Sequence, residues 1–277
     1  MNRIEGRYIS LLTDFGFKRI FGTKPNKDLL INFLNSLFEG FQVIKDVKYL
    51  NSEHVGDVFA ERKPIFDVYC ENEKGEKFIV EMQNASIFPI REQAPKGADW
   101  NFKLDHVYIV ALLNFDLSEE AFDKDDINHD VGLLDKKTHK VFNDKLSFKY
   151  VEIAKFDKTE DELVTLYDKW LYVLKNLSRL DERPAALKEK VFTKLFEEAE
   201  IAKFIPTELK EYEDSLKAYR DIKNSIDTAL ENGREEGRAE SKNLKVIQIA
   251  KKMLAAGMDI DTIINMTDLS KSEIEKL

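Results

Sequence analysis

Two strand-like runs joined by a tight loop constrain this chain more than any other feature. The runs cover residues 65–70 and 78–83, and Glu73-Lys74-Gly75 places glycine where a three-residue hairpin loop favours positive φ. If Asn72 pairs with Glu76, the numbers of paired residues sum to 148. The two-residue period of a strand then gathers one wholly apolar face, which must be buried. That face holds Phe66, Val68, Cys70, Phe78, Val80 and Met82. The chain therefore has to fold around a β-sheet that contains this hairpin.

The opposite face of the hairpin carries two acidic residues. In the same register Asp67 is directly opposite Glu81, and Gln83 belongs to the same face. The Cβ atoms of such a pair are about 4.5–5.5 Å apart, so the carboxylates repel unless one is protonated or a cation lies between them. Mg²⁺ takes one or two carboxylates together with water and substrate phosphate, and it can activate a bound water. This face predicts a metal site acting on a phosphate, with Gln83 orienting the water or a phosphate oxygen.

A simpler interpretation needs no metal. Asp67 then pairs with Arg62 or Lys63, and Glu81 is a solvated residue on an exposed sheet face. The apolar neighbours on that face argue against full exposure. Patterning alone leaves both interpretations open.

The rest of the first half predicts further strands and two helices. The additional strand-like runs are 43–50, 106–115, 138–142 and 146–153. Asp14 caps a short helix that Gly22 ends, and Asn26 caps a longer one that Gly40 stops. This mixture indicates an α/β domain over residues 1–155.

From Thr159 onward the sequence period is helical. Thr159 with Glu162 forms a capping-box pattern, and Pro184 suits the first turn of a helix. After Pro206, apolar residues recur at steps of three and four, which fits either a coiled coil or a helix packed on its own domain. They are Leu209, Tyr212, Leu216, Tyr219, Ile222, Ile226 and Leu230.

Residues 231–241 are charged on nearly every helical face and contain two glycines, each of which weakens a helix by about 1 kcal/mol. This composition predicts a solvated hinge-like helix or linker at a domain boundary. Beyond it we expect three short helices, with Gly257 ending the first, Asp259 capping the second and Ser270 with Glu273 opening the third. The predicted divisions are 1–155, a helical region 156–240 and a three-helix tail 241–277.

Composition excludes several classes of protein. The 43 Lys and Arg against 52 Asp and Glu give a net charge of −9, so any nucleic-acid contact must be local. The single Cys70 cannot form an internal disulfide, and the four His show no spacing typical of a zinc site. No apolar run approaches the roughly 18 residues that a membrane span needs. We therefore expect a cytoplasmic protein without a membrane partner.

Six ordered phrases carry a family resemblance. They are TDFGFKRIFG (13–22), LLINFLNSL (29–37), RKPIFDVYC (62–70), FIVEMQ (78–83), FPIREQAPKGADWNFKLDHVYIV (88–110) and KWLYVLKNLSRL (169–180). Together they resemble the recombination-promoting nuclease (Rpn) and putative transposase family of the PD-(D/E)xK nuclease superfamily. The resemblance implies an α/β fold, a nuclease-like mixed sheet flanked by helices, followed by a helical C-terminal region. It also implies a DNA endonuclease that depends on Mg²⁺ (or Mn²⁺) and is connected to recombination.

The same resemblance assigns roles to four residues. Asp67 matches the metal-binding aspartate of the family and Glu81 its second acidic ligand. Gln83 occupies the third catalytic position, where the superfamily usually has lysine. Asp14 matches an additional acidic residue that some members bring to the metal, although it is equally a helix cap.

One departure from the family pattern keeps a rival hypothesis open. Related sequences have a helix-length segment after the E-x-Q strand, whereas only four residues separate Gln83 from Phe88 here. The rival is a catalytically decayed, non-enzymatic scaffold, either DNA-associated or oligomeric. An RNase also stays open, because nothing in the sequence distinguishes deoxyribose from ribose.

The tail resembles a small helix-turn-helix unit. Its lysines are nearly balanced by acidic residues, whereas phosphate contacts usually need a positive excess. This balance favours a protein-interaction role, including a homo-oligomer through the helical C-terminal region, over DNA reading.

Overall fold

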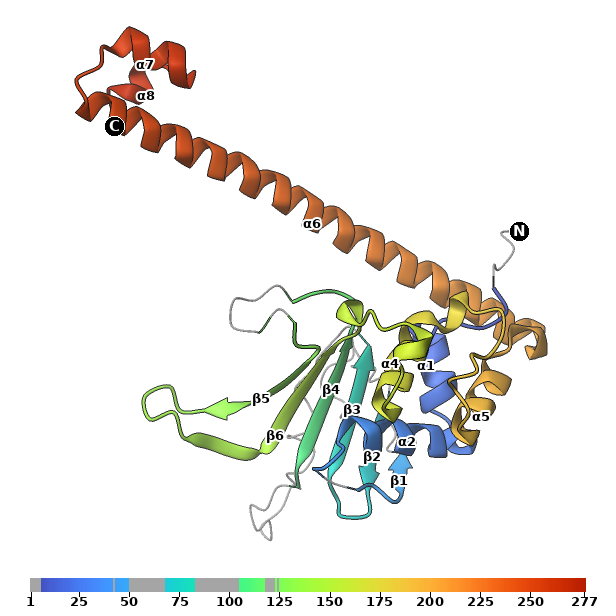
Figure 1. Cartoon of the computed structure of the whole chain (residues 1–277). Coiled ribbons are helices and arrows are strands. Elements are labelled where there is room, and N and C mark those ends of the chain that lie inside the picture. The colour runs from blue at the N-terminus through green and yellow to red at the C-terminus, as the bar shows by residue number, and fades with distance from the viewer. Residues whose placement is uncertain (1–5, 42, 50–67, 83–104, 118–122, 124) are drawn as a thin grey trace, which may run out of the picture. The chain divides into compact units, whose positions relative to one another are not determined.

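The computed structural model describes residues 6–41, 43–49, 68–82, 105–117, 123 and 125–277 (Figure 1). Within this part of the chain, six strands form one mixed sheet in the order β1-β2-β3-β4-β6-β5. The strands are β1 (Val47–Tyr49), β2 (Val68–Asn72), β3 (Lys77–Met82), β4 (Val107–Leu113), β5 (Asn128–Leu134) and β6 (Val141–Glu152). β3, β4 and β6 run parallel, and the other neighbours pair antiparallel. The predicted α/β fold with a mixed sheet is confirmed.

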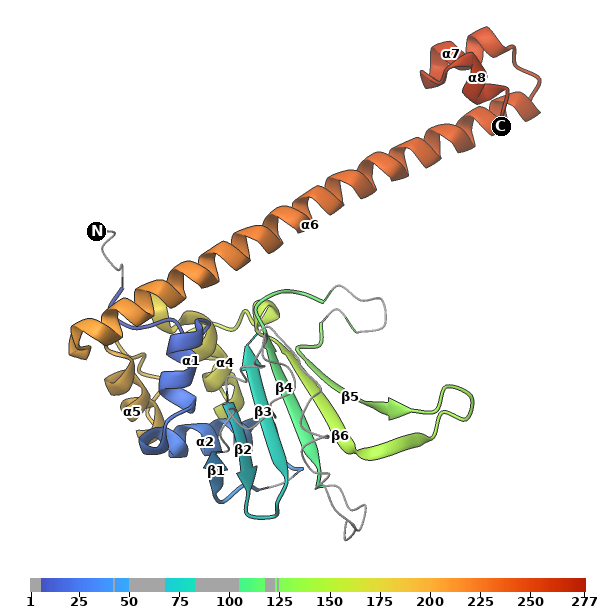
Figure 2. The same cartoon turned by 180° about the vertical axis from the view of Figure 1, so that it is seen from behind.

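The helices described before residue 200 gather beside the sheet (Figures 1 and 2), and further helices follow along the chain. They are α1 (Asp14–Phe21), α2 (Lys27–Leu37), α4 (Leu166–Asn176), α5 (Lys190–Ala199), α6 (Pro206–Ala255), α7 (Ile260–Thr267) and α8 (Lys271–Ile274). Short 3₁₀ turns are η1 (Lys24–Asn26), η3 (Ile153–Lys155), η4 (Glu160–Glu162), η5 (Leu177–Arg179) and η6 (Ile201–Lys203). None of these helices combines the length and the apolarity that crossing a lipid bilayer requires.

The main core lies between the sheet and helices α1, α2, α4 and α5. The even-numbered positions of β2 and β3 face it, as the hairpin pattern predicts, and Val68, Cys70, Phe78 and Val80 are all buried there. Trp170 of α4 is fully buried in the same cluster and donates a hydrogen bond to Asn32 Oδ1 at 2.8 Å. This apolar face fixes which side of the sheet the helices cover.

Several predicted boundaries differ from the structure for local reasons. The N-cap of α1 is Thr13, whose Oγ1 accepts from the backbone of Gly16 at 3.1 Å, so Asp14 is the first helical residue and not the cap. The Thr159 box opens only the 3₁₀ turn η4, and α4 begins at Leu166 behind a second box formed by Thr165. Pro184 begins a turn, in which its carbonyl accepts from Leu187 at 3.1 Å, and not a helix.

Residues 141–142 of the predicted run 138–142 and residues 146–152 of the predicted run 146–153 belong to a single strand, β6, and residues 138–140 precede that strand. Its antiparallel partner β5 does not stand out in the sequence, because NHDVGLL contains only one β-branched residue, Val131, and no Phe, Tyr or Trp.

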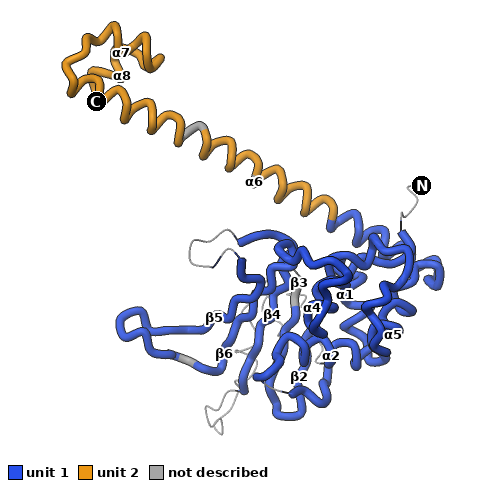
Figure 3. Tube along the Cα trace, in the orientation of Figure 1, with its two compact units in different colours: residues 1–219 blue, residues 220–277 orange. Residues whose placement is uncertain are grey.

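The described chain divides into two compact units, residues 1–219 and 220–277 (Figure 3). In the first unit, Tyr212 is buried in the main core, and Leu216 and Tyr219 pack against it, so this part of the apolar stripe serves its own domain. In the second unit, Ile222 is 51% exposed. The charged segment 231–241 is helical and continues α6. The three-part division drawn from the sequence stays a prediction.

The second unit is a small helical bundle. Ala250 of α6, Ile263 of α7 and Ile274 of α8 form its buried core. The predicted caps are confirmed: Asp259 accepts from the backbone of Thr262 at 2.9 Å, and Ser270 and Glu273 form a capping box. Gly257 has φ +77°, which favours glycine after a helix end.

Candidate active site

The hairpin that carries the predicted site has the register expected from its sequence. Val68 pairs with Val80, and Cys70 pairs with Phe78. Each pair sums to 148, as predicted (68 + 80 and 70 + 78). Asn72 shapes the turn, because its Oδ1 accepts from the backbone of Lys74 and of Glu76 at 3.0 Å each. Gly75 adopts φ +83°. The local sequence thus determines this turn.

Strand β3 leads from the hairpin into the parallel part of the sheet. Glu81 pairs with Ala111 of β4, Ala111 pairs with Tyr150 of β6, and Tyr150 pairs with His129 of β5. These four positions form a row across the sheet, close to the carboxyl ends of three parallel strands. Ligand sites of open α/β sheets are found outside such ends.

Near the hairpin turn, the sheet face that includes position 81 is buried. Ile79 and Tyr69 are 0% and 6% exposed and form a second core with Val107, Ile109 and Leu146. The interpretation of this hairpin as having one exposed, solvated face is therefore wrong for these neighbours. A carboxylate beside such an apolar cluster is expected to need a cation or a hydrogen-bond donor, because burying an unpaired charge is unfavourable.

The four predicted site residues are described to different extents. Asp67 and Gln83 lie outside the described residues, and Glu81 is described in its backbone only. Asp14, at the start of α1, is exposed and forms an ion pair with Lys18 at 2.5 Å. The assignments of Asp67, Glu81 and Gln83, and the role of Asp14 as a metal ligand, stay predictions.

The TDFGFKRIFG phrase has a structural explanation that the sequence did not provide. A Cβ atom on Gly16 would be 2.1 Å from the carbonyl oxygen of Ser10, so only glycine fits there. Arg19 donates to the carbonyl of Glu198 and forms an ion pair with Glu208 at 2.7 Å. These contacts of Arg19 connect α1 with α5 and α6.

A buried ion cluster lies at the same end of the sheet. The Glu152 carboxylate is fully buried and contacts Lys155 Nζ at 2.6 Å and His129 Nε2 at 2.8 Å. It also accepts from the backbone N–H of Leu117 at 2.5 Å. Burial alone would raise the pKa of Glu152, but the hydrogen bonds from Lys155, Leu117 and His129 outweigh it and lower that pKa. The same contact raises the pKa of Lys155.

Ion pairs and a backbone hydrogen bond among described residues hold this cluster together. In the described part of the chain, no three His, Cys, Asp or Glu side chains are grouped closely enough to hold a metal. The sequence offers no signal for this cluster, since His129 lies on the unpredicted strand β5 and Glu152, Lys155 and His129 share no motif.

Comparisons with known proteins identify the family. Residues 11–229 match the family model described as PD-(D/E)XK nuclease family transposase. Residues 243–277 match the model described as Rpn/YhgA-like nuclease family, C-terminal HTH domain. No curated protein and no solved structure gives a significant match. The helix-turn-helix match favours DNA binding by the tail, against the preference drawn from its balanced charge. Because the first match spans most of its length, the chain belongs to the PD-(D/E)XK nuclease family transposases.

Proposed function

We propose that this chain is a divalent-metal-dependent endonuclease that cleaves DNA. Asp67 and Glu81 hold Mg²⁺ or Mn²⁺, and Gln83 orients the attacking water or a phosphate oxygen. The observation that carries the proposal is the register of β2 and β3, in which the numbers of paired residues sum to 148. If the same register continued by one pair, it would set position 67 opposite position 81. Membership of a nuclease family and the place of β3 beside a parallel strand support it.

The residues divide the chemistry in a defined way. A bound divalent ion would lower the pKa of a water and polarise a phosphoryl oxygen. Asp67 and Glu81 orient that ion through carboxylate oxygens, which are the ligands that hard cations prefer. The amide of Gln83 can donate or accept a hydrogen bond but adds no positive charge beside the phosphate. We therefore expect Gln83→Lys to be tolerated.

The test is cleavage of supercoiled plasmid by the purified full-length chain, with Mg²⁺ and with EDTA. We expect nicked or linear product only with the metal, and none from Asp67→Ala or Glu81→Ala. Glu71→Gln is the matched control, because Glu71 is a carboxylate of the same hairpin, paired with Lys77 at 3.0 Å, and should retain cleavage. The variant Asp14→Asn is assayed for cleavage in the same way, to test whether Asp14 is an additional metal ligand. A single-stranded RNA arm separates DNA from RNA substrates. Cleavage by Asp67→Ala at the parental rate would refute the assignment.

A binding measurement separates the enzyme from a decayed scaffold. A ligand that binds only the folded state raises its melting temperature. Titration with Mg²⁺ or Mn²⁺ should raise the melting temperature of the parent and of Glu71→Gln, but not of Asp67→Ala. A scaffold that binds no metal would show no difference between parent and variant.

A further inference from the structure

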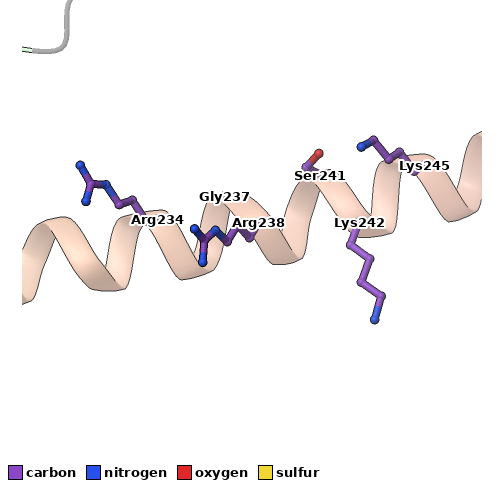
Figure 4. A pocket seen from close by; sticks show the side chains of 6 residues that line it. All are labelled: Arg234, Gly237, Arg238, Ser241, Lys242 and Lys245. Atoms are coloured by element: carbon purple, nitrogen blue, oxygen red, sulfur yellow. The ribbon is translucent and has the colours of Figure 1, made fainter.

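One face of α6 in the second unit carries a row of cationic side chains. Arg234, Gly237, Arg238, Ser241, Lys242 and Lys245 line a single shallow, open groove (Figure 4). They follow one another at steps of one, three or four, which keeps them on one side of a helix that turns about 100° per residue. The same step places positions 236 and 240, both glutamates, on the opposite side. Four cations thus gather on one face of the helix, and Glu231 and Glu235 lie beside Lys242 on the same side.

The cations of this groove are available to a partner. Arg234, Arg238, Lys242 and Lys245 are all exposed, and within the described residues none of them forms an ion pair. By contrast, Arg19 and Lys155 are held by carboxylates of the first unit. Four unpaired charges on about 16 Å of helix repel one another, so an anionic partner would stabilise them.

The two glycines of this segment are a second observation that favours a partner at this face. Nothing lies within 4 Å of the position that a Cβ would take on Gly233 or Gly237. Glycine weakens a helix relative to alanine, and no close approach within the described chain requires it at either position. Gly237 lines the groove, where the missing side chain lets a partner's backbone come close to the helix.

We propose that this face of α6 binds the phosphate backbone of duplex DNA beside the helix-turn-helix unit. Arg234, Arg238 and Lys242 fall between the two matched regions, 11–229 and 243–277, so neither match assigns them. Lys245 is already part of the helix-turn-helix match, and α6 runs without a break into the small core around Ala250. Backbone contacts of this kind set the register of a protein on DNA without reading its sequence.

The charge of the unit explains why this face is needed. Residues 220–277 contain ten Lys and Arg against eleven Asp and Glu, a net charge of −1. A unit without a net positive charge gains no general attraction to DNA. The stretch 234–252 contains six Lys and Arg against three Glu, a net charge of +3, and so supplies the local excess. The proposal shares its substrate with the proposed function but needs no cleavage.

The test is equilibrium binding of the full-length chain to a fluorescent 30-base-pair duplex in EDTA, as a function of salt. Each phosphate contact contributes about −0.9 to the slope of log K against log salt. We expect the variant Arg234→Gln, Arg238→Gln, Lys242→Gln, Lys245→Gln to bind more weakly, with a slope smaller in magnitude by about 3 to 4.

The matched control removes the same charge from the earlier part of α6. It carries Lys210→Gln, Lys217→Gln, Arg220→Gln and Lys223→Gln, and we expect it to keep the parental slope. The proposal would be overturned by an unchanged slope in the first variant or by an equal loss of slope in both variants. It would also be overturned if the chain bound an acidic protein but not the duplex. Circular dichroism checks that α6 remains helical in both variants. Because EDTA prevents metal-dependent cleavage, absence of nuclease activity leaves this measurement intact.

Discussion

The ion cluster at the end of the sheet yields a quantitative prediction for Glu152→Gln. Glutamine has nearly the same shape and can still accept from the N–H of Leu117. It cannot balance the ammonium of Lys155, and its own NH₂ group competes with that donor. Breaking a buried ion pair by removing one partner costs about 3–5 kcal/mol, because the other charge is left uncompensated. Lys155 keeps 16% of its side chain exposed, so we expect the lower end, about 3 kcal/mol.

Urea unfolding measures this loss, with Asp130→Asn as the control. Asp130 pairs with Lys149 at 2.6 Å on the neighbouring strand, but its side chain is 76% exposed. An exposed pair contributes about 0–1 kcal/mol. The free energies follow from the unfolding midpoint and slope of each variant. If Glu152→Gln lies within 1 kcal/mol of Asp130→Asn, the argument from burial is refuted.

The stabilisation by Glu152 also has a defined pH dependence. The folded protein lowers the pKa of Glu152, whereas the unfolded chain keeps an ordinary value of about 4.3. The contribution is therefore complete above the unfolded pKa and is lost as pH falls through the lower, folded pKa. The difference in unfolding free energy between parent and Glu152→Gln should be constant between pH 6 and 8 and shrink below about pH 4. A difference that grows in acid would contradict this sign.

Two further predictions concern packing in the first unit. Gly16→Ala should destabilise the fold by about 2 kcal/mol and lower the melting temperature by roughly 4–8 °C, because its Cβ would overlap the carbonyl of Ser10. The control Gly132→Ala has open space around its Cβ and should stabilise the fold by about 0.5–1 kcal/mol. Equal shifts of the two melting temperatures in calorimetry would contradict the overlap. Burial raises the pKa of the Cys70 thiol to about 12, so a thiol reagent should label it only through unfolding, and rapid labelling of the folded protein at pH 8 would contradict its burial.

Features that depend on neighbouring residues could be predicted from the sequence. The hairpin register rests on Asn72, Gly75 and the alternation on either side, all within about ten residues. The caps at Asp259 and Ser270 use side chains three residues from the backbone that they bind. In each case one physical requirement, a positive φ or an unsatisfied N–H, acts on the local sequence alone.

Features that depend on distant residues could not be predicted. Gly16 is required by the carbonyl of Ser10, a backbone atom that no residue type reveals. Glu152 and His129 meet because β5 returns along β6, and β5 has too few strand-forming residues to be recognised. The true start of α4 at Leu166 follows from a second capping box that competes with the one at Thr159. Tertiary pairing decided the placement of β5 over local propensity, whereas the box at Thr165 that sets the start of α4 is a local signal that competes with the one at Thr159.

Net charge was the least informative property of the sequence for DNA binding. The value of −9 excludes a cationic coat, and the tail alone is almost neutral. Both net charges add up residues that lie on opposite faces of a helix, so they hide a difference in charge between those faces. Once residues 231–241 are known to be helical, Arg234 and Arg238 fall on one side and positions 236 and 240 on the other. A contact with DNA depends on the potential at that face, because screening limits charge interactions to about 8–10 Å at physiological salt. An acidic chain can therefore bind DNA through a short polarised helix, provided that the rest of its charge lies farther from the phosphates than this distance.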